Sequence, residues 1–309
     1  MIYTVTLNPA LDRAVTVGRL LPDDTTRMTG VTVYAAGKGI DVSRVVRELG
    51  GTSVALGFVG GYAGRQLEGL LINAGVVCDF TEIAGETRTN IILRESEQGR
   101  QYAVSAPGPE AGPAAIGRLC DQVRRLADLD YLVISGSLPR GVTANVYNQL
   151  IQTGRAHGAF VMLDADGEAL REGIAHGPAC IKPNHHELGR LVGRELADEA
   201  QILDACTEVH AMGVKHIIVS RGRHGLIYSD AAGPRYKAVS PPVEADSTVG
   251  AGDSVVGGFV LAHSRGLVAG ECLRWGCAAG AATARTPGTE LCHRADVEAI
   301  LDQVVVTAL

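Results

Sequence analysis

Two apolar runs, Tyr131-Leu132-Val133-Ile134 and Phe160-Val161-Met162-Leu163, stand on either side of a helical pattern at Ala144–His157. Both runs are continuously apolar, which is typical of strands that are buried on both faces of a sheet. Two strands that are joined through a helix form a βαβ unit, and the strands of such a unit run parallel. This stretch therefore predicts a parallel sheet that is covered by helices.

The same alternation of strand and helix patterns continues toward both ends of the chain. It is typical of an α/β fold with helices on both faces of one sheet. The further expected strands are Ile2–Leu7, Ser53–Phe58 and His216–Val219, and the further expected helices are Gly64–Ala74, Pro113–Ala127, Glu199–Met212 and Ser254–His263.

Two stretches, residues 12–35 and 87–105, depart from this alternation of strands and helices. Their alternating polarity, with no long helix within either stretch, is typical of extended segments. They are compatible with plain surface hairpins, or with a small separate sheet placed as a lid over the main one. No linker, low-complexity tract or repeat divides the chain, so we expect a single domain over residues 1–309. The extended segments are Ala14–Val17, Val31–Tyr34, Asn90–Leu93 and Gln101–Val104.

The chain has 309 residues, a formal net charge of -6 and a hydrophobic fraction of 46%. These values are ordinary for a soluble globular protein, and a mildly acidic chain lacks the electrostatic footprint of a nucleic-acid binder. No apolar run is long enough to span a bilayer, and the N-terminus lacks the regions of a signal peptide. We therefore expect a cytoplasmic protein with neither a nucleic-acid nor a membrane partner.

Seven cysteines are scattered along the chain, and no two have C-x-x-C spacing. An odd number without such spacing favours reduced, buried thiols over a disulfide framework or a metal site. The cysteines are Cys78, Cys120, Cys180, Cys206, Cys272, Cys277 and Cys292.

The tetrapeptide Gly250-Ala251-Gly252-Asp253 precedes a helical pattern of small residues. Glycines let the backbone approach a ligand closely, and a helix N-terminus offers free N–H groups to an anion. Phosphoryl transfer needs such a site, together with a residue that accepts the proton of the attacking hydroxyl, and Asp253 fits that role. The segment is equally compatible with a glycine-rich turn whose Asp is favoured by the helix dipole.

A second candidate is Lys182–Glu187, which follows an apolar run and precedes a helix. Glu187 could organise a hydrated Mg²⁺, and Asn184 could contact a phosphate or the metal's water shell. Asn-x-x-Glu is also a helix capping box, and the two roles are compatible. His185 and His186 lack the second histidine of a zinc-binding helix, so we expect exposed residues of a first helical turn.

Weaker signals surround these two motifs. The glycine-bracketed loop Ser220–Gly225 could touch nucleotide phosphates, although an ordinary hairpin loop is the simpler reading. The run Ala35–Val42 opens a helix and is no P-loop, yet its Gly-Lys-Gly could bring N–H groups and a cation to an anion. Arginine matches the geometry of phosphate, so charged residues in the extended segments could bind a sugar phosphate. Isolated polar residues of this kind are Asp12, Arg27, Arg88 and Ser137.

These motifs occur together and in order, and the chain resembles the ribokinase-like (PfkB) family of carbohydrate kinases, in particular its phosphofructokinase and tagatose-6-phosphate kinase branch. The resemblance covers essentially the whole chain. It implies a Rossmann-like sheet flanked by helices, a β lid that also makes a homodimer contact, and the use of ATP and Mg²⁺. The matching segments are Thr6–Asp12, Ala35–Val42, Gly85–Asn90, Ile134–Pro139, Asp164–Leu170, Lys182–Glu187, Ser247–Asp253 and Gly288–Cys292.

The resemblance also implies roles for individual residues. Asp253 would be the catalytic base, with Gly250, Ala251 and Gly252 as the anion hole. The nucleotide and Mg²⁺ would be held by Lys182, Asn184, Glu187, Ser220, Gly222, Gly225 and Thr248. The sugar phosphate would be held by Asp12, Arg27, Gly37, Lys38, Asp41, Arg88 and Ser137. Some members also bind K⁺ through backbone oxygens, which here would come from Ser247, Val249, Thr283, Thr286 and Gly288.

Four positions depart from the family pattern. Asp41 replaces the usual Asn, which matters because an ionised Asp only accepts hydrogen bonds and repels a phosphate. The others are Thr25 in place of a basic residue, Arg140 in place of a second proline, and Arg221 in place of a leucine.

These departures leave the phosphoryl-transfer machinery intact and bear on the acceptor. We expect an ATP-dependent kinase, with fructose 1-phosphate converted to fructose 1,6-bisphosphate as the favoured reaction. The alternatives are a 6-phosphofructokinase or tagatose-6-phosphate kinase, a kinase of an unphosphorylated sugar or nucleoside, and a catalytically silent sugar or nucleotide sensor.

Overall fold

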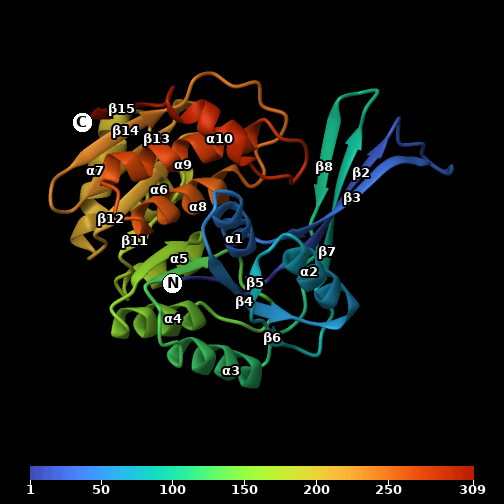
Figure 1. Ribbon diagram of the computed structural model, residues 1–309, viewed down its shortest axis with the longest axis horizontal. Helices are drawn as coiled ribbons and strands as arrows, with labels where there is room; N and C mark the ends of the chain where they lie inside the picture. The colour runs from blue at the N-terminus through green and yellow to red at the C-terminus, as the bar shows by residue number, and fades with distance from the viewer.

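An eleven-stranded sheet runs through the body of the molecule, in the computed structural model that describes residues 1–309 (Figure 1). The path of strands is β15-β14-β13-β12-β11-β10-β9-β1-β4-β5, and β6 pairs with β4 beside it. The strands are β1 (Ile2–Thr6), β4 (Ser53–Val59), β5 (Val77–Cys78), β6 (Thr81–Glu82), β9 (Tyr131–Ser135), β10 (Phe160–Asp164), β11 (Cys180–Ile181), β12 (His216–Ser220), β13 (Leu226–Asp230), β14 (Arg235–Val239) and β15 (Val305–Ala308).

The parallel part of this sheet confirms the strands that were expected from apolar runs. β9 and β10 pair in parallel with Val133 opposite Met162, and β1 lies between β4 and β9. The expectation of an all-parallel sheet is wrong at one edge, because β13, β14 and β15 are antiparallel. The short loop between β12 and β13 explains the first reversal, since only antiparallel neighbours can be joined so tightly.

Helices cover both faces of the sheet, as expected (Figure 1). One face packs against α3 to α7 around a core cluster of 33 buried residues, and the other against α1 and α8 to α10 around a cluster of 29. The helices α5, α9 and α10 had no counterpart among the expected ones. The helices are α1 (Lys38–Glu48), α2 (Gly61–Asn73), α3 (Pro113–Arg124), α4 (Asn145–Ala156), α5 (Gly167–Ile174), α6 (His185–Val192), α7 (Glu199–Ala211), α8 (Ala251–Ser264), α9 (Ala269–Ala284) and α10 (Arg294–Leu301).

The two extended stretches, residues 12–35 and 87–105, form a second, four-stranded sheet, which we call the small sheet. Its order is β3-β2-β7-β8, with β2 parallel to β7, so the extended segments pair with one another and are more than separate hairpins. The small sheet projects from the body at one side (Figure 1). Its strands are β2 (Ala10–Val17), β3 (Met28–Ala36), β7 (Arg88–Glu95) and β8 (Arg100–Val104).

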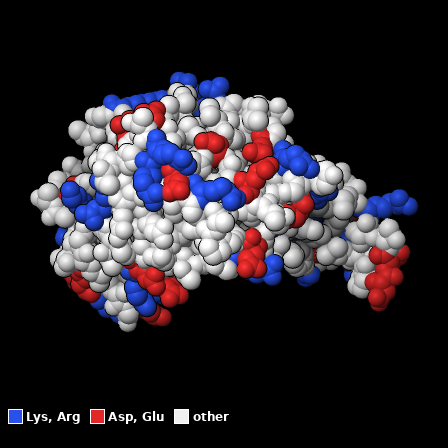
Figure 2. All heavy atoms as spheres, turned by 90° about the horizontal axis from the view of Figure 1, so that it is seen from below, with Lys and Arg blue, Asp and Glu red and all other residues white.

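The surface carries charges of both signs. On the face seen in Figure 2, basic and acidic side chains are interspersed over the body and along the projecting small sheet. All seven cysteines are free thiols; six are buried, and Cys78 is partly exposed. None of the helices combines the length and the apolar character that crossing a membrane would require.

Candidate active site

Polar side chains gather where the parallel strands end. Asp164 is the last residue of β10, Lys182 follows β11, and Ser220 is the last residue of β12. β10, β11 and β12 are neighbours in the sheet, so their carboxyl ends meet at one edge. In open α/β sheets ligands bind in the crevice outside this edge.

Gly250 to Asp253 form the N-terminus of α8, which begins earlier than expected, at Ala251. Gly250 caps the helix in the left-handed region with φ at 76°, which favours glycine, and a Cβ there would lie 2.5 Å from Leu291 Cδ2. The N–H groups of Gly252 and Asp253 have no backbone acceptor. The turn therefore presents free donors at the positive end of a helix dipole, as anion binding requires.

A buried carboxylate, Asp164, joins the two lysines of the site. Its Oδ1 lies 3.3 Å from Lys38 Nζ and 3.5 Å from Lys182 Nζ, and its side chain is 1% exposed. A Cβ on Gly252 would lie 3.4 Å from Lys182 Nζ, so this ammonium group borders the α8 turn. Two cations are thus held beside the place where an anion would sit.

Asp164 was absent from the expected site residues. A signal was available: Leu163 pairs with Ile181 in parallel register, which puts the next residues, Asp164 and Lys182, side by side. Reading that signal requires the knowledge that β10 and β11 are neighbours.

Charge and burial perturb the ionisable groups of this cluster. Burial, followed by the repulsion of Asp164 and Asp41, raises the pKa of Asp253 well above its ordinary value, against the opposing effect of Lys38 and Lys182. Asp164 is the main cause that raises the pKa of Lys38. Burial pushes the pKa of Asp164 upward, but Lys182 and Lys38 outweigh it and keep the pKa below the ordinary value.

Two more buried carboxyl groups lie among the residues that the resemblance assigned to the sugar phosphate. Asp41 on α1 forms an ion pair with Arg44 at 3.0 Å, and Asp12 on β2 accepts a hydrogen bond from Asn90 at 2.8 Å. Burial raises the pKa of Asp41 to about 7, with Arg44 opposing and Asp12 adding to the shift. Gly37 caps α1 with φ at 128° against β1, where a Cβ would lie 2.8 Å from Thr6 Cγ2.

Arg88, at the start of β7, lines a cavity of about 880 Å³ at the base of the small sheet. Its Nη1 donates to the carbonyl of Ala106 at 2.8 Å, while its buried Nε has no partner. Ser137, which follows β9, lies next to this region and is held by Asn8 at 3.3 Å.

The Lys182–Glu187 motif begins α6 with the expected capping box. Asn184 Oδ1 accepts from the Glu187 N–H at 2.9 Å, and Glu187 Oε2 accepts from the Asn184 N–H at 2.8 Å. Glu187 Oε1 makes no hydrogen bond, and a carboxylate oxygen is a ligand that hydrated Mg²⁺ prefers. The motif thus fits a metal that keeps its waters. His185 is partly exposed and His186 exposed, both in the first helical turn.

The loop after β12 lies against this motif. Ser220 donates its N–H to the carbonyl of Pro183 at 3.1 Å, and it forms an isolated bridge with Asn184. Gly222 opens a 3₁₀ turn, and a Cβ on Gly225 would lie 2.0 Å from the carbonyl oxygen of Ala238. Thr248, two residues before Gly250, accepts the N–H of Ala251. Two motifs that are distant in sequence therefore border one surface.

The residues suggested for K⁺ also lie together, just before α8 and after α9. Ser247 donates to the carbonyl of Gly288 at 2.6 Å, and Thr286 donates to the carbonyl of Thr283 at 2.7 Å. Val249 donates its N–H to Ser247 Oγ, and the buried Thr289 Oγ1, next to Gly288, has no partner. Clustered carbonyl and hydroxyl oxygens with a spare buried oxygen fit a hard cation.

Arg27 is the one expected acceptor residue that lies apart from the others. It precedes β3, at the exposed far end of the small sheet. At roughly 3.3 Å per residue, β3 places it about 30 Å from Gly37. Within one chain, Arg27 therefore contacts none of the groups described above.

Together, an α/β sheet with a helix-terminal anion site, a buried carboxyl group and two fixed lysines define a phosphotransferase. The family described as pfkB family carbohydrate kinase matches residues 6–296. The chain belongs to this family of carbohydrate kinases, which confirms the kinase class and the fold that the resemblance implied.

Three matches give the family a finer context. The chain is 36% identical to an ATP-dependent 6-phosphofructokinase isozyme 2 of Escherichia coli, over 97% of each chain. It is 34% identical to a 1-phosphofructokinase of Bacillus subtilis, over 100% of each. The structure of phosphofructokinase-2 from E. coli in complex with potassium superposes with a TM-score of 0.92 at 36% identity, over 97% of this chain and 98% of that one.

Proposed function

We propose that this protein is an ATP-dependent kinase that converts fructose 1-phosphate to fructose 1,6-bisphosphate. The observation that carries the proposal is the buried Asp253 at the N-terminus of α8, next to two lysines that Asp164 holds. Phosphofructokinases among the relatives support a ketohexose phosphate as the acceptor.

In this proposal Asp253 accepts the proton of the acceptor hydroxyl as that oxygen attacks the γ-phosphorus of ATP. The bond to the bridging oxygen breaks, and ADP leaves. The raised pKa of Asp253 makes it a better proton acceptor than an exposed Asp. The N–H groups of the Gly250–Gly252 turn and the ammonium groups of Lys38 and Lys182 stabilise the charge of the transferred group.

The nucleotide would lie along the surface bordered by the Lys182–Glu187 motif and the loop after β12. Ser220, Gly222, Gly225 and Thr248 supply its walls, and the glycines let the backbone approach the phosphates. Mg²⁺, when bound, would neutralise phosphate charge. Glu187 Oε1 and Asn184 would hold it, directly or through water. The oxygens around Ser247 and Gly288 would hold K⁺.

A second acceptor class is favoured by one observation. The carboxyl of Asp41 is buried in the acceptor site. A carboxylate accepts hydrogen bonds from sugar hydroxyls and repels phosphate. An unphosphorylated sugar or nucleoside is therefore the second candidate. A 6-phosphofructokinase or tagatose-6-phosphate kinase would differ from the favoured enzyme only in the acceptor. A catalytically silent sensor would not need a catalytic base such as Asp253, which argues against that alternative.

We further propose a cytoplasmic homodimer built on one catalytic domain, residues 1–309, with the small sheet as lid. One face of the small sheet carries Asp12 and Asn90 toward the acceptor site. The opposite face has an exposed apolar row: Val31, Ile91, Tyr102 and Val104. Pairing of this row between two chains would bury it. Arg27 could serve only the partner's site, since it is remote from its own.

The test is ADP release with fructose 1-phosphate, fructose 6-phosphate, tagatose 6-phosphate, tagatose 1-phosphate and fructose, each at low and high K⁺. We expect the fastest turnover with fructose 1-phosphate. Asp253→Asn should lower kcat by at least about a thousandfold, because loss of the base adds to loss of charge. ATP binding, measured by calorimetry, should persist in this variant. Near-normal turnover by Asp253→Asn would exclude the mechanism, and turnover of fructose alone would select the second candidate.

A further inference from the structure

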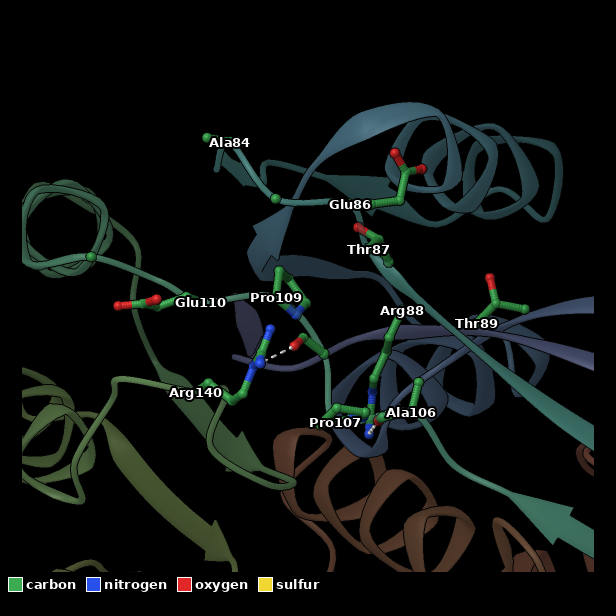
Figure 3. A pocket seen from close by; sticks show the side chains of 13 residues that line it. Ala84, Glu86, Thr87, Arg88, Thr89, Ala106, Pro107, Pro109, Glu110 and Arg140 are labelled. Carbon is green, nitrogen blue, oxygen red and sulfur yellow. Dashed lines mark hydrogen bonds between the residues drawn. The ribbon is translucent and has the colours of Figure 1, made fainter.

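The loop Ala106–Gly108, which leads from the small sheet back to the body, lies between two arginines. Arg88 and Arg140 both line the cavity of about 880 Å³ at the base of the small sheet. Arg88 enters from β7, and Arg140 from the segment that follows β9 (Figure 3). Two cations from separate parts of the chain thus share one open space.

Three successive carbonyls of this loop accept hydrogen bonds from three different side chains. Arg88 donates to Ala106 at 2.8 Å, Asn8 to Pro107 at 3.3 Å, and Arg140 Nε to Gly108 at 3.2 Å. The loop is therefore fixed, and it holds the two guanidinium groups in place on its two sides (Figure 3).

Most of the donors of these arginines are unused. A guanidinium has five N–H donors, and each arginine uses one nitrogen, on a backbone carbonyl and not on a carboxylate. The Nε of Arg88 is buried without any partner, which is costly unless a ligand supplies an acceptor. The two carboxylates that also line the cavity, Glu86 and Glu110, turn away from the loop (Figure 3).

In the proposed acceptor site, the acidic and the basic side chains lie in separate parts. Asp12 and Asp41 present carboxyl oxygens, which accept hydrogen bonds from sugar hydroxyls but donate none to a phosphate when ionised. Arg88 and Arg140 present the fork geometry that binds a phosphate monoester through paired N–H groups. An acceptor that carries a phosphate can satisfy both halves only with its phosphate toward the arginines.

We propose that Arg140, together with Arg88, binds the phosphate group that the acceptor already carries. Arg140 is thereby a specificity-determining residue for phosphorylated over neutral sugars. This assignment rests on the proposed sugar-phosphate kinase activity and adds a residue that the family resemblance did not suggest for the site.

The test compares Arg140→Ala with Arg118→Ala, a matched control. Arg118 is also exposed and donates one hydrogen bond to a backbone carbonyl, that of Glu82, and it is not among the residues that line the cavity at Arg88. Charge-assisted hydrogen bonds contribute about 1.5 kcal/mol or more, so KM for fructose 1-phosphate should rise about tenfold in Arg140→Ala. Its kcat and its KM for ATP should stay within about twofold of the original values. The reason is that Arg140 would bind the sugar's phosphate equally in the ground state and in the transition state. Arg118→Ala should change none of these, and Arg140→Lys should recover part of the loss.

Inorganic phosphate is the second probe. At saturating ATP it should compete with fructose 1-phosphate, and Arg140→Ala should raise its inhibition constant by a similar factor. A KM within about twofold of the original protein in Arg140→Ala would overturn the proposal, since one lost phosphate contact costs more than that. An unchanged inhibition constant would reduce Arg140 to a loop contact. Noncompetitive inhibition that depends on Arg140 would instead place a separate regulatory phosphate there, which also overturns it.

The two proposals fail in distinguishable ways. If the original protein releases no ADP with any sugar phosphate, the proposed function fails, and this assignment fails with it. If the original protein is active and Arg140→Ala behaves like Arg118→Ala, only the role of Arg140 fails.

Discussion

At the scale of single residues, Asp164 connects the two lysines of the candidate site. One buried carboxylate oxygen lies within 3.5 Å of both Lys38 and Lys182, which come from α1 and from the end of β11. Without that charge the two ammonium groups would repel each other, and neither would be held beside the α8 turn. Asp164 therefore acts in this structure as a positioning residue for two cations.

We expect Asp164→Asn to lower kcat by about a hundredfold, the effect typical of losing one preorganised electrostatic contact. The readout that distinguishes positioning from general loss of structure is a lowered kcat in a variant whose circular dichroism and urea unfolding midpoint are unchanged. Asp121→Asn is the control, because the ion pair of Asp121 with Arg124 lies on the exposed surface of α3. A kcat within about threefold of the original value would argue against this role.

At the scale of elements, the loop between β12 and β13 shows how a turn fixes the geometry of the site. The loop from β12 to β13 contains two glycines with positive φ, but their surroundings differ. Gly222 has φ at 56° and open space around it, whereas Gly225 has φ at 78° and faces the carbonyl of Ala238 on β14. The loop that borders the proposed nucleotide surface is thus anchored where the backbone of Gly225 touches that of Ala238.

Alanine substitutions at these two glycines should separate backbone strain from steric conflict. Gly222→Ala should lower the free energy of unfolding by about 1 kcal/mol, the cost of a left-handed conformation with a Cβ. Gly225→Ala should cost at least about 2 kcal/mol more, because its Cβ also collides with a backbone oxygen that cannot move alone. Urea unfolding measures both. Equal losses in the two variants would show that β14 shifts freely and that the contact is unimportant.

At the scale of the whole molecule, two sheets meet at the proposed acceptor site. The large sheet carries the groups proposed for phosphoryl transfer at its carboxyl edge, and the small sheet carries Asp12 and Arg88 at its base. The face of the small sheet opposite Asp12 carries an exposed apolar row in a single chain, and the sheet projects away from the body (Figure 1). An exposed apolar face of this kind is typical of an interaction surface.

We expect Ile91→Asp to convert the proposed dimer to a monomer, because a charge would be buried in the apolar contact. Gln101→Asp is the matched control. Gln101 is also exposed and pairs with Arg94, on the opposite face of the same sheet. Sedimentation equilibrium measures the mass of each variant. A monomeric original protein, or a dimer that survives Ile91→Asp, would exclude this face as the contact.

Local patterns of the sequence determined most of the elements and two of the motifs. The β9–α4–β10 unit, the capping box at Asn184 and the glycine-rich start of α8 all depend on residues that are close along the chain, and each was predicted. Helices α5, α9 and α10 were not expected from the sequence. For α9 we attribute this to its run of Ala and Gly, since such small residues form no clear apolar stripe.

The tertiary structure alone decided which distant residues meet. Asp164 joins Lys38 and Lys182 because β10 lies between β9 and β11, and strand order is a non-local property. Arg140 shares a cavity with Arg88 because the segment after β8 runs beside the segment after β9, with a bridge between Glu110 and Arg140, while Arg27 lies at the other end of the small sheet. Pattern and spacing report how a segment folds, whereas the long-range pairing of strands decides which side chains share one site.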